Sequence, residues 1–150
     1  MKIILTGGGS GGHFYPIIAI AEELREICKE QKLLDPNFVF FGPTPYNEKV
    51  LFEQQIYFEK VPAGKRRTYS SILNFIDLFK TAYGILVAMW KVFWFYPDVI
   101  FSKGGYGSFP VVLAGKILGI PIIIHESDSY PGRVNIWAGI FKLSPSWDAV

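Results

Sequence analysis

Short apolar runs alternate along the chain with longer segments in which apolar residues recur every three or four positions. The short runs predict strands, which lie at residues 2–6, 38–41, 56–61, 98–102 and 121–125, with the start of a sixth at 148–150. The longer segments predict helices, which lie near residues 16–30, 46–54, 72–95, 109–118 and 131–143. Strands that are apolar throughout and separated by crossover helices are typical of a parallel sheet covered on both faces. The pattern therefore predicts an α/β domain with a Rossmann-like, doubly wound parallel sheet.

The predicted helix near residues 16–30 has one apolar face. The residues of that face recur at helical spacing: Ile17, Ile20, Ala21, Leu24, Ile27 and Cys28. Charged residues such as Glu22, Arg25 and Lys29 lie opposite. Cys28 is therefore predicted to be a core residue, and as a single cysteine it cannot form an internal disulfide, which favours a cytosolic chain.

With 150 residues, the chain can form one domain but not two full ones. It stops where a sixth strand begins, so we expect it to be a piece of a longer protein. A formal net charge of +2 gives no indication of nucleic-acid binding. The fraction of aromatic residues, 17%, is high for a soluble protein and needs an explanation.

A glycine-rich segment, TGGGSGGHFYP at residues 6–16, follows the first predicted strand. Its glycines at positions 7, 9 and 12 match the dinucleotide-binding fingerprint, in the required position between a strand and a helix. A nicotinamide-binding domain also places an acidic residue at the end of its second strand, and residues 39–43 contain none. The segment is thus predicted to bind a phosphate that does not belong to a nicotinamide or flavin cofactor.

A second glycine-rich segment, SKGGYGSFP at residues 102–110, follows the fourth predicted strand. Ser108 is placed to cap the next helix, and Pro110 is tolerated in its first turn. In the common strand order 3-2-1-4-5, the first and fourth strands are neighbours, so both glycine segments would converge on one crevice. Two helix N-termini there would form an anion site, and the alternative is that both segments are simply tight turns.

A third segment, HESDSYPGRVN at residues 125–135, leaves the fifth predicted strand toward the same crevice. It is dense in polar side chains that could contact sugar hydroxyls or cap a helix: His125, Glu126, Ser127, Asp128 and Asn135. His125, in the last turn of a buried strand, is expected to be oriented by backbone groups and not to act in catalysis.

These three segments, in this order and spacing, resemble the N-terminal half of the MurG family. Its members are UDP-N-acetylglucosamine:N-acetylmuramyl-(pentapeptide) pyrophosphoryl-undecaprenol N-acetylglucosamine transferases, which convert lipid I to lipid II in peptidoglycan synthesis. The resemblance implies a GT-B enzyme with two Rossmann-like domains facing each other. It implies that residues 1–150 form the N-terminal, acceptor-binding domain, and that a C-terminal donor-binding domain is absent from this chain.

The resemblance also implies residue roles. The donor sugar would contact Ser10, Gly11, Gly12 and Asp128, where threonine is more usual at position 10 and asparagine at position 128. The pyrophosphate and acceptor would contact Gly8, Gly9, Gly104, Gly105, Tyr106, Ser108 and Asn135.

Transfer to an acceptor hydroxyl needs a base, and His13 is a candidate because histidine is the side chain whose unperturbed pKa lies near neutral pH. Glu126 is the rival base, and the alternative for His13 is a hydrogen bond to a phosphate or sugar. The chain has no Asp-x-Asp, so we expect neither a metal nor another cofactor.

The aromatic residues would be explained by a membrane contact, since the implied acceptor carries a long lipid. The proposed contact residues are Lys65, Arg66, Arg67, Phe75, Phe79, Trp90 and Trp94. Basic residues beside aromatic ones are typical of a peripheral anchor on anionic lipid, here at the cytoplasmic face of the membrane. The alternative is a buried crossover helix. Asn74, Asp77, Lys80 and Lys91 interrupt the segment too often for a transmembrane helix.

The expected function is that of a hexosyltransferase that uses UDP-N-acetylglucosamine and inverts the anomeric carbon, with this domain inactive alone. Its expected partners are the undecaprenyl-linked acceptor, an anionic membrane surface and the missing C-terminal domain or a partner chain, but no nucleic acid. The alternative is a non-catalytic, membrane-recruiting subunit of a split N-acetylglucosaminyltransferase, whose partner chain supplies the donor site.

Overall fold

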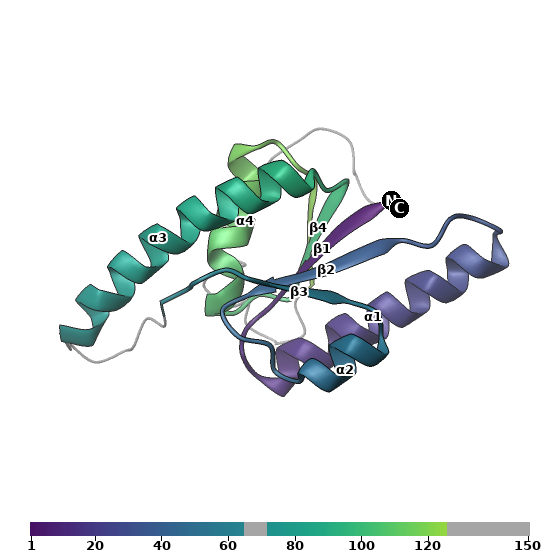
Figure 1. The fold of residues 1–150 in the computed structure, drawn as a ribbon, viewed down its shortest axis with the longest axis horizontal. Helices are drawn as coiled ribbons and strands as arrows, with labels where there is room; N and C mark the ends of the chain where they lie inside the picture. The colour runs from purple at the N-terminus through teal and green to yellow at the C-terminus, as the bar shows by residue number, and fades with distance from the viewer. Residues whose placement is uncertain (65–71, 126–150) are drawn as a thin grey trace.

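The computed structural model describes residues 1–64 and 72–125 and has a five-stranded parallel sheet (Figure 1). Its elements follow in the order β1 (Lys2–Thr6), α1 (Gly11–Glu30), β2 (Asn37–Gly42), α2 (Glu48–Glu53), β3 (Tyr57–Lys60), α3 (Ile72–Phe95), β4 (Val99–Ser102), the 3₁₀ turn η1 (Tyr106–Ser108), α4 (Phe109–Ile117) and β5 (Ile122–Ile124). The strand order is β3-β2-β1-β4-β5, and every pair of neighbours is parallel. This confirms the predicted doubly wound α/β fold. The helix predicted at 131–143 and the strand at 148–150 lie outside the described residues.

Two layers of helices cover the sheet, with α1 and α2 on one face and α3 and α4 on the other (Figure 1). Side chains of β1 alternate between the layers: Ile3 and Leu5 pack toward α1, and Ile4 packs toward α3. All three are buried, as expected for a strand in the centre of a parallel sheet. The carboxyl ends of β1 and β4 are therefore adjacent, which is where the two glycine segments emerge.

Helix α1 begins at Gly11, five residues before its predicted start, and runs through Pro16. Proline lacks an N–H, so the helical bond from residue 16 to the Gly12 carbonyl cannot form. Burial of Phe14 and Ile17 against the sheet stabilises this first turn, so tertiary packing overrides the poor helix propensity of its sequence. Cys28 is buried as predicted, whereas Ile27, predicted to face the core, is 37% exposed.

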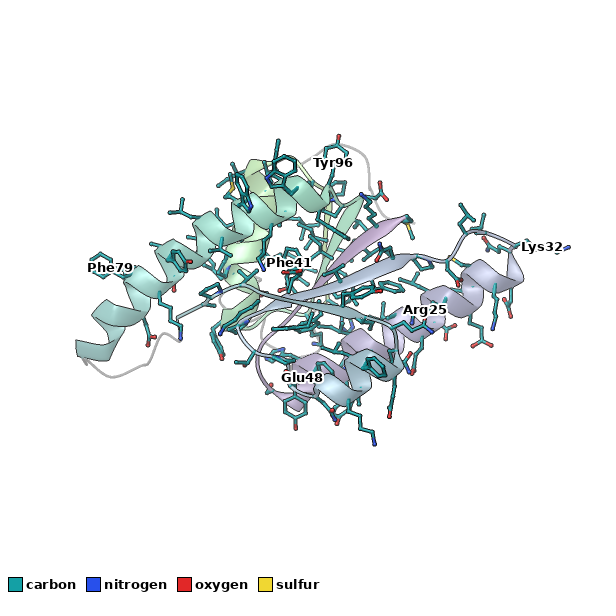
Figure 2. All side chains as sticks on the ribbon, viewed as in Figure 1. Arg25, Lys32, Phe41, Glu48, Phe79 and Tyr96 are labelled. Atoms are coloured by element: carbon teal, nitrogen blue, oxygen red, sulfur yellow. The ribbon has the colours of Figure 1, made fainter. Side chains whose placement is uncertain are left out.

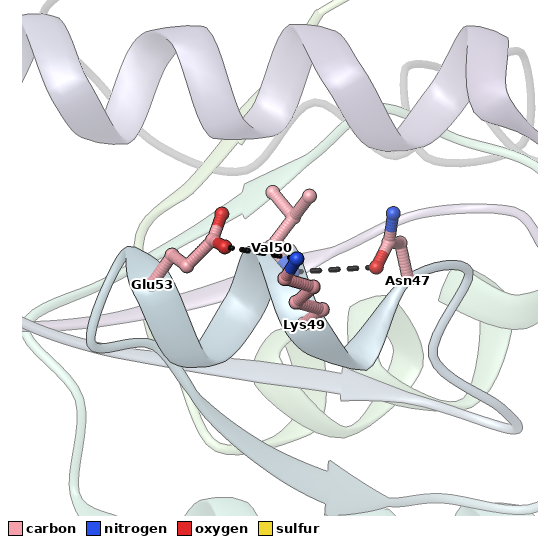
Figure 3. Close-up of polar contacts among 4 residues, drawn as sticks. All are labelled: Asn47, Lys49, Val50 and Glu53. Atoms are coloured by element: carbon pink, nitrogen blue, oxygen red, sulfur yellow. Dashed lines mark hydrogen bonds and ion pairs between the residues drawn. The ribbon is translucent and has the colours of Figure 1, made fainter.

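Helix α2 is held at both ends. At its start, the Oδ1 of Asn47 accepts the Val50 N–H at 3.3 Å, and Lys49 pairs with Glu53 at 3.8 Å one turn on (Figure 3). At its end, the Arg25 guanidinium donates to the carbonyls of Gln54 and Gln55, at 2.5 and 3.4 Å. The β2–α2 loop therefore ends at a fixed position.

Helix α3 is the crossover between β3 and β4, and one of its faces packs into the core through Ala88 and Val92. At Gly84 the helix touches the preceding segment, because a Cβ built there would lie 1.7 Å from the Pro62 carbonyl oxygen. By length and composition alone, Asp77–Phe95 could span a membrane, and 17% of that segment is buried. Helix α3 connects two strands of the same sheet and lies on the surface of this domain, where Figure 2 shows its Phe79 side chain pointing away from the sheet.

Candidate functional site

The two glycine segments meet at the carboxyl end of the sheet. We call residues 7–10 the first glycine loop and residues 103–105 the second. The Lys103 N–H donates to the Thr6 carbonyl at 3.0 Å, which continues the β1–β4 ladder into the loops. A Cβ built on Gly105 would lie 2.7 Å from the Gly8 Cα and 2.9 Å from the Gly8 nitrogen. The two loops are thus in close backbone contact, as expected for segments that converge at the carboxyl ends of β1 and β4.

His13 lies in the first turn of α1, with its imidazole against both loops. A Cβ on Gly8 would lie 2.8 Å from the His13 Cδ2, and a Cβ on Gly105 would lie 3.4 Å from its Nε2. The Nδ1 atom is buried and has no hydrogen-bond partner among the described residues. A buried nitrogen without a partner is costly, and such atoms occur at functional sites.

The start of α1 leaves polar groups open at the first glycine loop. Ser10 is the N-cap residue, is exposed, and makes no side-chain capping bond. Gly12 lies in the first helical turn, and a Cβ built on it would meet nothing within 4 Å. Its φ is not positive, so neither backbone conformation nor packing by the described residues requires a glycine there. A ligand that approaches the backbone would require one.

The second glycine loop is shaped by two serine hydroxyls. The Gly104 N–H donates to the Ser102 Oγ at 3.2 Å, and the Ser108 Oγ donates to the Gly105 carbonyl at 2.8 Å. The prediction that Ser108 caps α4 is wrong, because Ser108 has helical backbone angles, makes no capping bond and lies at the end of η1. Ser108 is also fully buried, so we expect it to support the loop and not to donate to a phosphate.

Two tyrosine hydroxyls lie against the first glycine loop and the helix start. The Tyr106 Oη lies 3.2 Å from a Cβ built on Gly9, which places this predicted acceptor residue beside the loop. The Tyr46 Oη lies 3.1 Å from a Cβ built on Gly11. The sequence interpretation missed Tyr46, because this contact joins segments 35 residues apart and leaves no local pattern.

A buried lysine also escaped the sequence interpretation. Lys103 begins the second glycine loop and is 2% exposed, although lysine is almost never fully buried. The sequence feature that could have revealed Lys103 is its position directly after a predicted strand and before two glycines.

Several predicted site residues lie outside the described residues: Glu126, Asp128, Asn135, Lys65, Arg66, Arg67 and the side chain of Phe75. His125 is within them; its N–H donates to the Ser102 carbonyl at 2.9 Å, and its ring stacks on Phe101. The prediction that it ends a buried strand is wrong, because β5 is only partly buried and His125 is exposed. No three His, Cys, Asp or Glu side chains gather as metal ligands within residues 1–64 and 72–125.

The outward side of α3 and the residue directly after it carry large exposed apolar side chains, which we call the aromatic face: Leu78, Phe79, Tyr83, Leu86, Trp90, Phe93 and Trp94 of the helix, and Tyr96. Trp90 and Trp94 are each 66% exposed, and their rings meet edge to face at 5.5 Å. Large exposed apolar side chains gathered on one helix in this way are typical of an interaction surface.

Comparison with known proteins agrees with the geometry. Two curated relatives are the proteins of Clostridium kluyveri and Clostridium perfringens, which are 42% and 38% identical to this chain. Both are named UDP-N-acetylglucosamine--N-acetylmuramyl-(pentapeptide) pyrophosphoryl-undecaprenol N-acetylglucosamine transferase. The matches cover 89% and 93% of this chain, but 36% and 38% of those proteins. The chain thus spans little more than a third of the length of these relatives.

Solved structures show the same fold. The MurG of Acinetobacter baumannii superposes with a TM-score of 0.70 at 24% identity, over 93% of this chain and 39% of that one. A UDP complex of Staphylococcus aureus MnaA gives a TM-score of 0.55 at 20% identity, over 93% of this chain and 36% of the other. The profile of the glycosyltransferase family 28 N-terminal domain matches residues 3–143. The resemblance to the MurG family is confirmed, and the chain belongs to the glycosyltransferase family 28 N-terminal domain family.

Proposed function

We propose that this chain is the acceptor-binding domain of an inverting hexosyltransferase. The enzyme moves N-acetylglucosamine from UDP to the muramyl sugar of undecaprenyl-pyrophosphoryl-MurNAc-pentapeptide, the step from lipid I to lipid II in peptidoglycan synthesis. The observation that carries the proposal is the backbone contact between the two glycine loops around His13. The names of the relatives support the choice of donor and acceptor.

The loops suit an acceptor pyrophosphate because Gly9 and Ser10 are exposed and Gly105 is partly exposed near the start of α1, although Gly8 and Gly104 are buried. A helix N-terminus acts as roughly half a positive charge, and its first N–H groups have no partner within the helix. In our proposal, Gly8, Gly9, Gly104 and Gly105 contact the pyrophosphate, with Tyr106 and Asn135 on the rest of the acceptor. Ser10, Gly11, Gly12 and Asp128 contact the donor sugar.

In the chemical step, the acceptor hydroxyl oxygen bonds to the anomeric carbon while that carbon's bond to UDP breaks. The bonding electron pair leaves with UDP, and the hydroxyl proton passes to a base. We assign the base to His13, with Glu126 as the rival. His13 suits the role because its ring contacts both loops and its Nδ1 is not engaged by any described residue. The proposed step uses neither a metal nor a cofactor.

An alternative from another class is a membrane-recruiting subunit that lacks the donor site and works with a partner chain. The enzyme and the subunit must be distinguished because this chain matches only 36% and 38% of the length of the two relatives. The test is to purify the full-length gene product alone and supply labelled UDP-N-acetylglucosamine with the lipid acceptor. Label in the lipid without another protein supports the enzyme, and label only after a second chain is added supports the subunit. No transfer in either case contradicts both.

Gly12→Ala separates function from folding. Alanine is favoured over glycine in a helix by about 1 kcal/mol, and the space at Gly12 is open, so the variant is expected to be as stable as the wild type or slightly more stable. Transfer is nevertheless expected to fall about tenfold or more, since the new methyl group blocks a ligand from the backbone, a loss of about 1.4 kcal/mol. Urea unfolding and steady-state kinetics measure the two effects. Unchanged kinetics would remove Gly12 from the site.

We further propose that the aromatic face binds the membrane surface, with Phe79, Trp90 and Trp94 as contacts. The further proposed contacts are Lys65, Arg66, Arg67 and Phe75. The exposed rings support this, because amphipathic aromatic side chains favour the interface between lipid headgroups and acyl chains. Attraction of basic residues to anionic lipid adds about 1 kcal/mol for each residue near the surface. The protein would then be peripheral, on the cytoplasmic side where UDP-sugars are available.

The double variant Trp90→Ser/Trp94→Ser is expected to weaken binding of the full-length protein to anionic vesicles at least about tenfold, because two exposed indoles no longer enter the interface. Vesicle sedimentation at low salt measures the effect. The matched control is Phe52→Ser, which removes an exposed ring from α2, on the face of the sheet opposite α3 (Figure 1). Equal loss in the control, or no vesicle binding by the wild type, would contradict the membrane proposal.

A further inference from the structure

Tyr46 occupies a fixed position beside the candidate site. It lies in the β2–α2 loop, directly before the Asn47 cap of α2 that Figure 3 shows. Its ring packs against the buried ring of Phe14 at 5.6 Å and meets Tyr15 edge to face at 5.8 Å. The two tyrosines are nevertheless about half exposed, at 51% for Tyr15 and 50% for Tyr46. Tyr46 therefore presents an anchored aromatic surface to solvent.

The anchored ring is directed at the first turn of α1. A Cβ built on Gly11 would lie 3.1 Å from the Tyr46 Oη, 3.2 Å from its Cζ and 3.4 Å from its Cε1. A methyl group at Gly11 would therefore be tight against this ring, whereas one at its neighbour Gly12 would meet open space. The ring and the open space lie side by side at the start of the helix.

The position of Tyr46 also differs from that of Tyr106. The Tyr106 hydroxyl lies against Gly9. The preceding residue, Gly8, contacts the second glycine loop and the His13 ring. Tyr46 lies against Gly11, two residues further along the same segment. In the proposed function, the Gly9 side holds the acceptor pyrophosphate and the Gly11–Gly12 side holds the donor sugar.

We propose that Tyr46 is a specificity-determining residue for the donor sugar, with its ring forming one wall of the pocket against the hexosamine ring. The inference rests on the proposed function and adds a residue to it. A tyrosine suits this role because it offers a rigid apolar ring at a low cost in conformational entropy. The ring makes the contact, and the hydroxyl is secondary.

The test uses the full-length protein, with the concentrations of UDP-N-acetylglucosamine and of the lipid acceptor varied separately. Tyr46→Ala is expected to raise the KM for UDP-N-acetylglucosamine about tenfold, with kcat and the acceptor KM within about twofold of the wild type. Tyr46→Phe, which keeps the ring, is expected to stay within about twofold on every constant. The inhibition constant of UDP, which carries no sugar, is expected to remain unchanged in both variants. Tyr57→Ala is the control for loss of an exposed tyrosine elsewhere.

Each other outcome overturns the inference. An unchanged donor KM in Tyr46→Ala means that the ring does not contact the donor. If Tyr46→Ala weakens binding of UDP and of UDP-N-acetylglucosamine equally, Tyr46 acts on the nucleotide or on folding. If it raises the KM for the acceptor, Tyr46 contacts the other substrate. In all three cases the wild type transfers the sugar, so the proposed function stands. A wild type that transfers nothing overturns the proposed function and this inference with it.

Discussion

Gly105→Ala is expected to destabilise the domain by about 2–5 kcal/mol and to reduce sugar transfer at least about a hundredfold. Gly105 has φ +85° and ψ 166°, a backbone conformation that only glycine adopts readily. The added methyl group would also lie 2.7 Å from the Gly8 Cα, and neither backbone can yield without separating the two loops. Urea unfolding gives the stability change, and initial rates at a temperature where the variant stays folded give the change in transfer.

Gly119→Ala is the matched control for Gly105→Ala. Gly119 also has a positive φ, +70°, but a Cβ built there meets nothing within 4 Å. It therefore carries the backbone strain, about 1–2 kcal/mol, without the contact between loops. We expect the control to keep full transfer activity. Equal loss of transfer in both variants would mean that general destabilisation, and not the contact between the loops, explains the result.

His13→Ala in the full-length protein is expected to lower kcat at least about a hundredfold with a modest change in the KM for UDP-N-acetylglucosamine, as loss of a general base should. The imidazole contacts both loops, so its removal also leaves a space between Gly8 and Gly105. Steady-state kinetics, with circular dichroism to confirm folding, measure the effect. A kcat near that of the wild type would remove His13 from the role of base.

His13→Gln distinguishes the two proposed roles of His13, a general base or a hydrogen-bond donor to a phosphate or sugar. Glutamine fills part of the space and keeps an N–H donor, but it does not accept a proton near neutral pH. If His13 is the base, the glutamine variant is as slow as the alanine variant. Recovery of most of the wild-type kcat would instead favour a hydrogen bond to a phosphate or sugar, and would make Glu126 the preferred base.

The fold was largely predictable because its signals are local. Each described strand lies within about one residue of its prediction, and the order β3-β2-β1-β4-β5 is the common doubly wound order that we assumed from the alternation of strands and helices. The start of α1 was missed because glycine and proline are poor helix formers, and only burial of Phe14 and Ile17 explains the extra turn. The turn η1 was missed for a similar reason, since short 3₁₀ segments have little sequence pattern of their own.

The candidate site was predictable in part. Glycine segments after β1 and β4 imply a shared crevice once the strand order is known, and the loops do meet there. The hydrogen bond from Ser108 to Gly105 was not predictable, since a serine before a helix more often caps it. The approach of Tyr46 to Gly11 depends on how the β2–α2 loop folds over α1, and it too has no counterpart in the local sequence.

The central claim is that the two glycine loops form one site for the pyrophosphate of a lipid-linked acceptor. The most direct measurement is the ratio of kcat/KM for otherwise identical acceptors carrying a pyrophosphate or a single phosphate, in the full-length wild type and in the control Gly119→Ala. Our account predicts that both proteins prefer the pyrophosphate acceptor at least about tenfold, which corresponds to about 1.4 kcal/mol. Equal use of the two acceptors would contradict it.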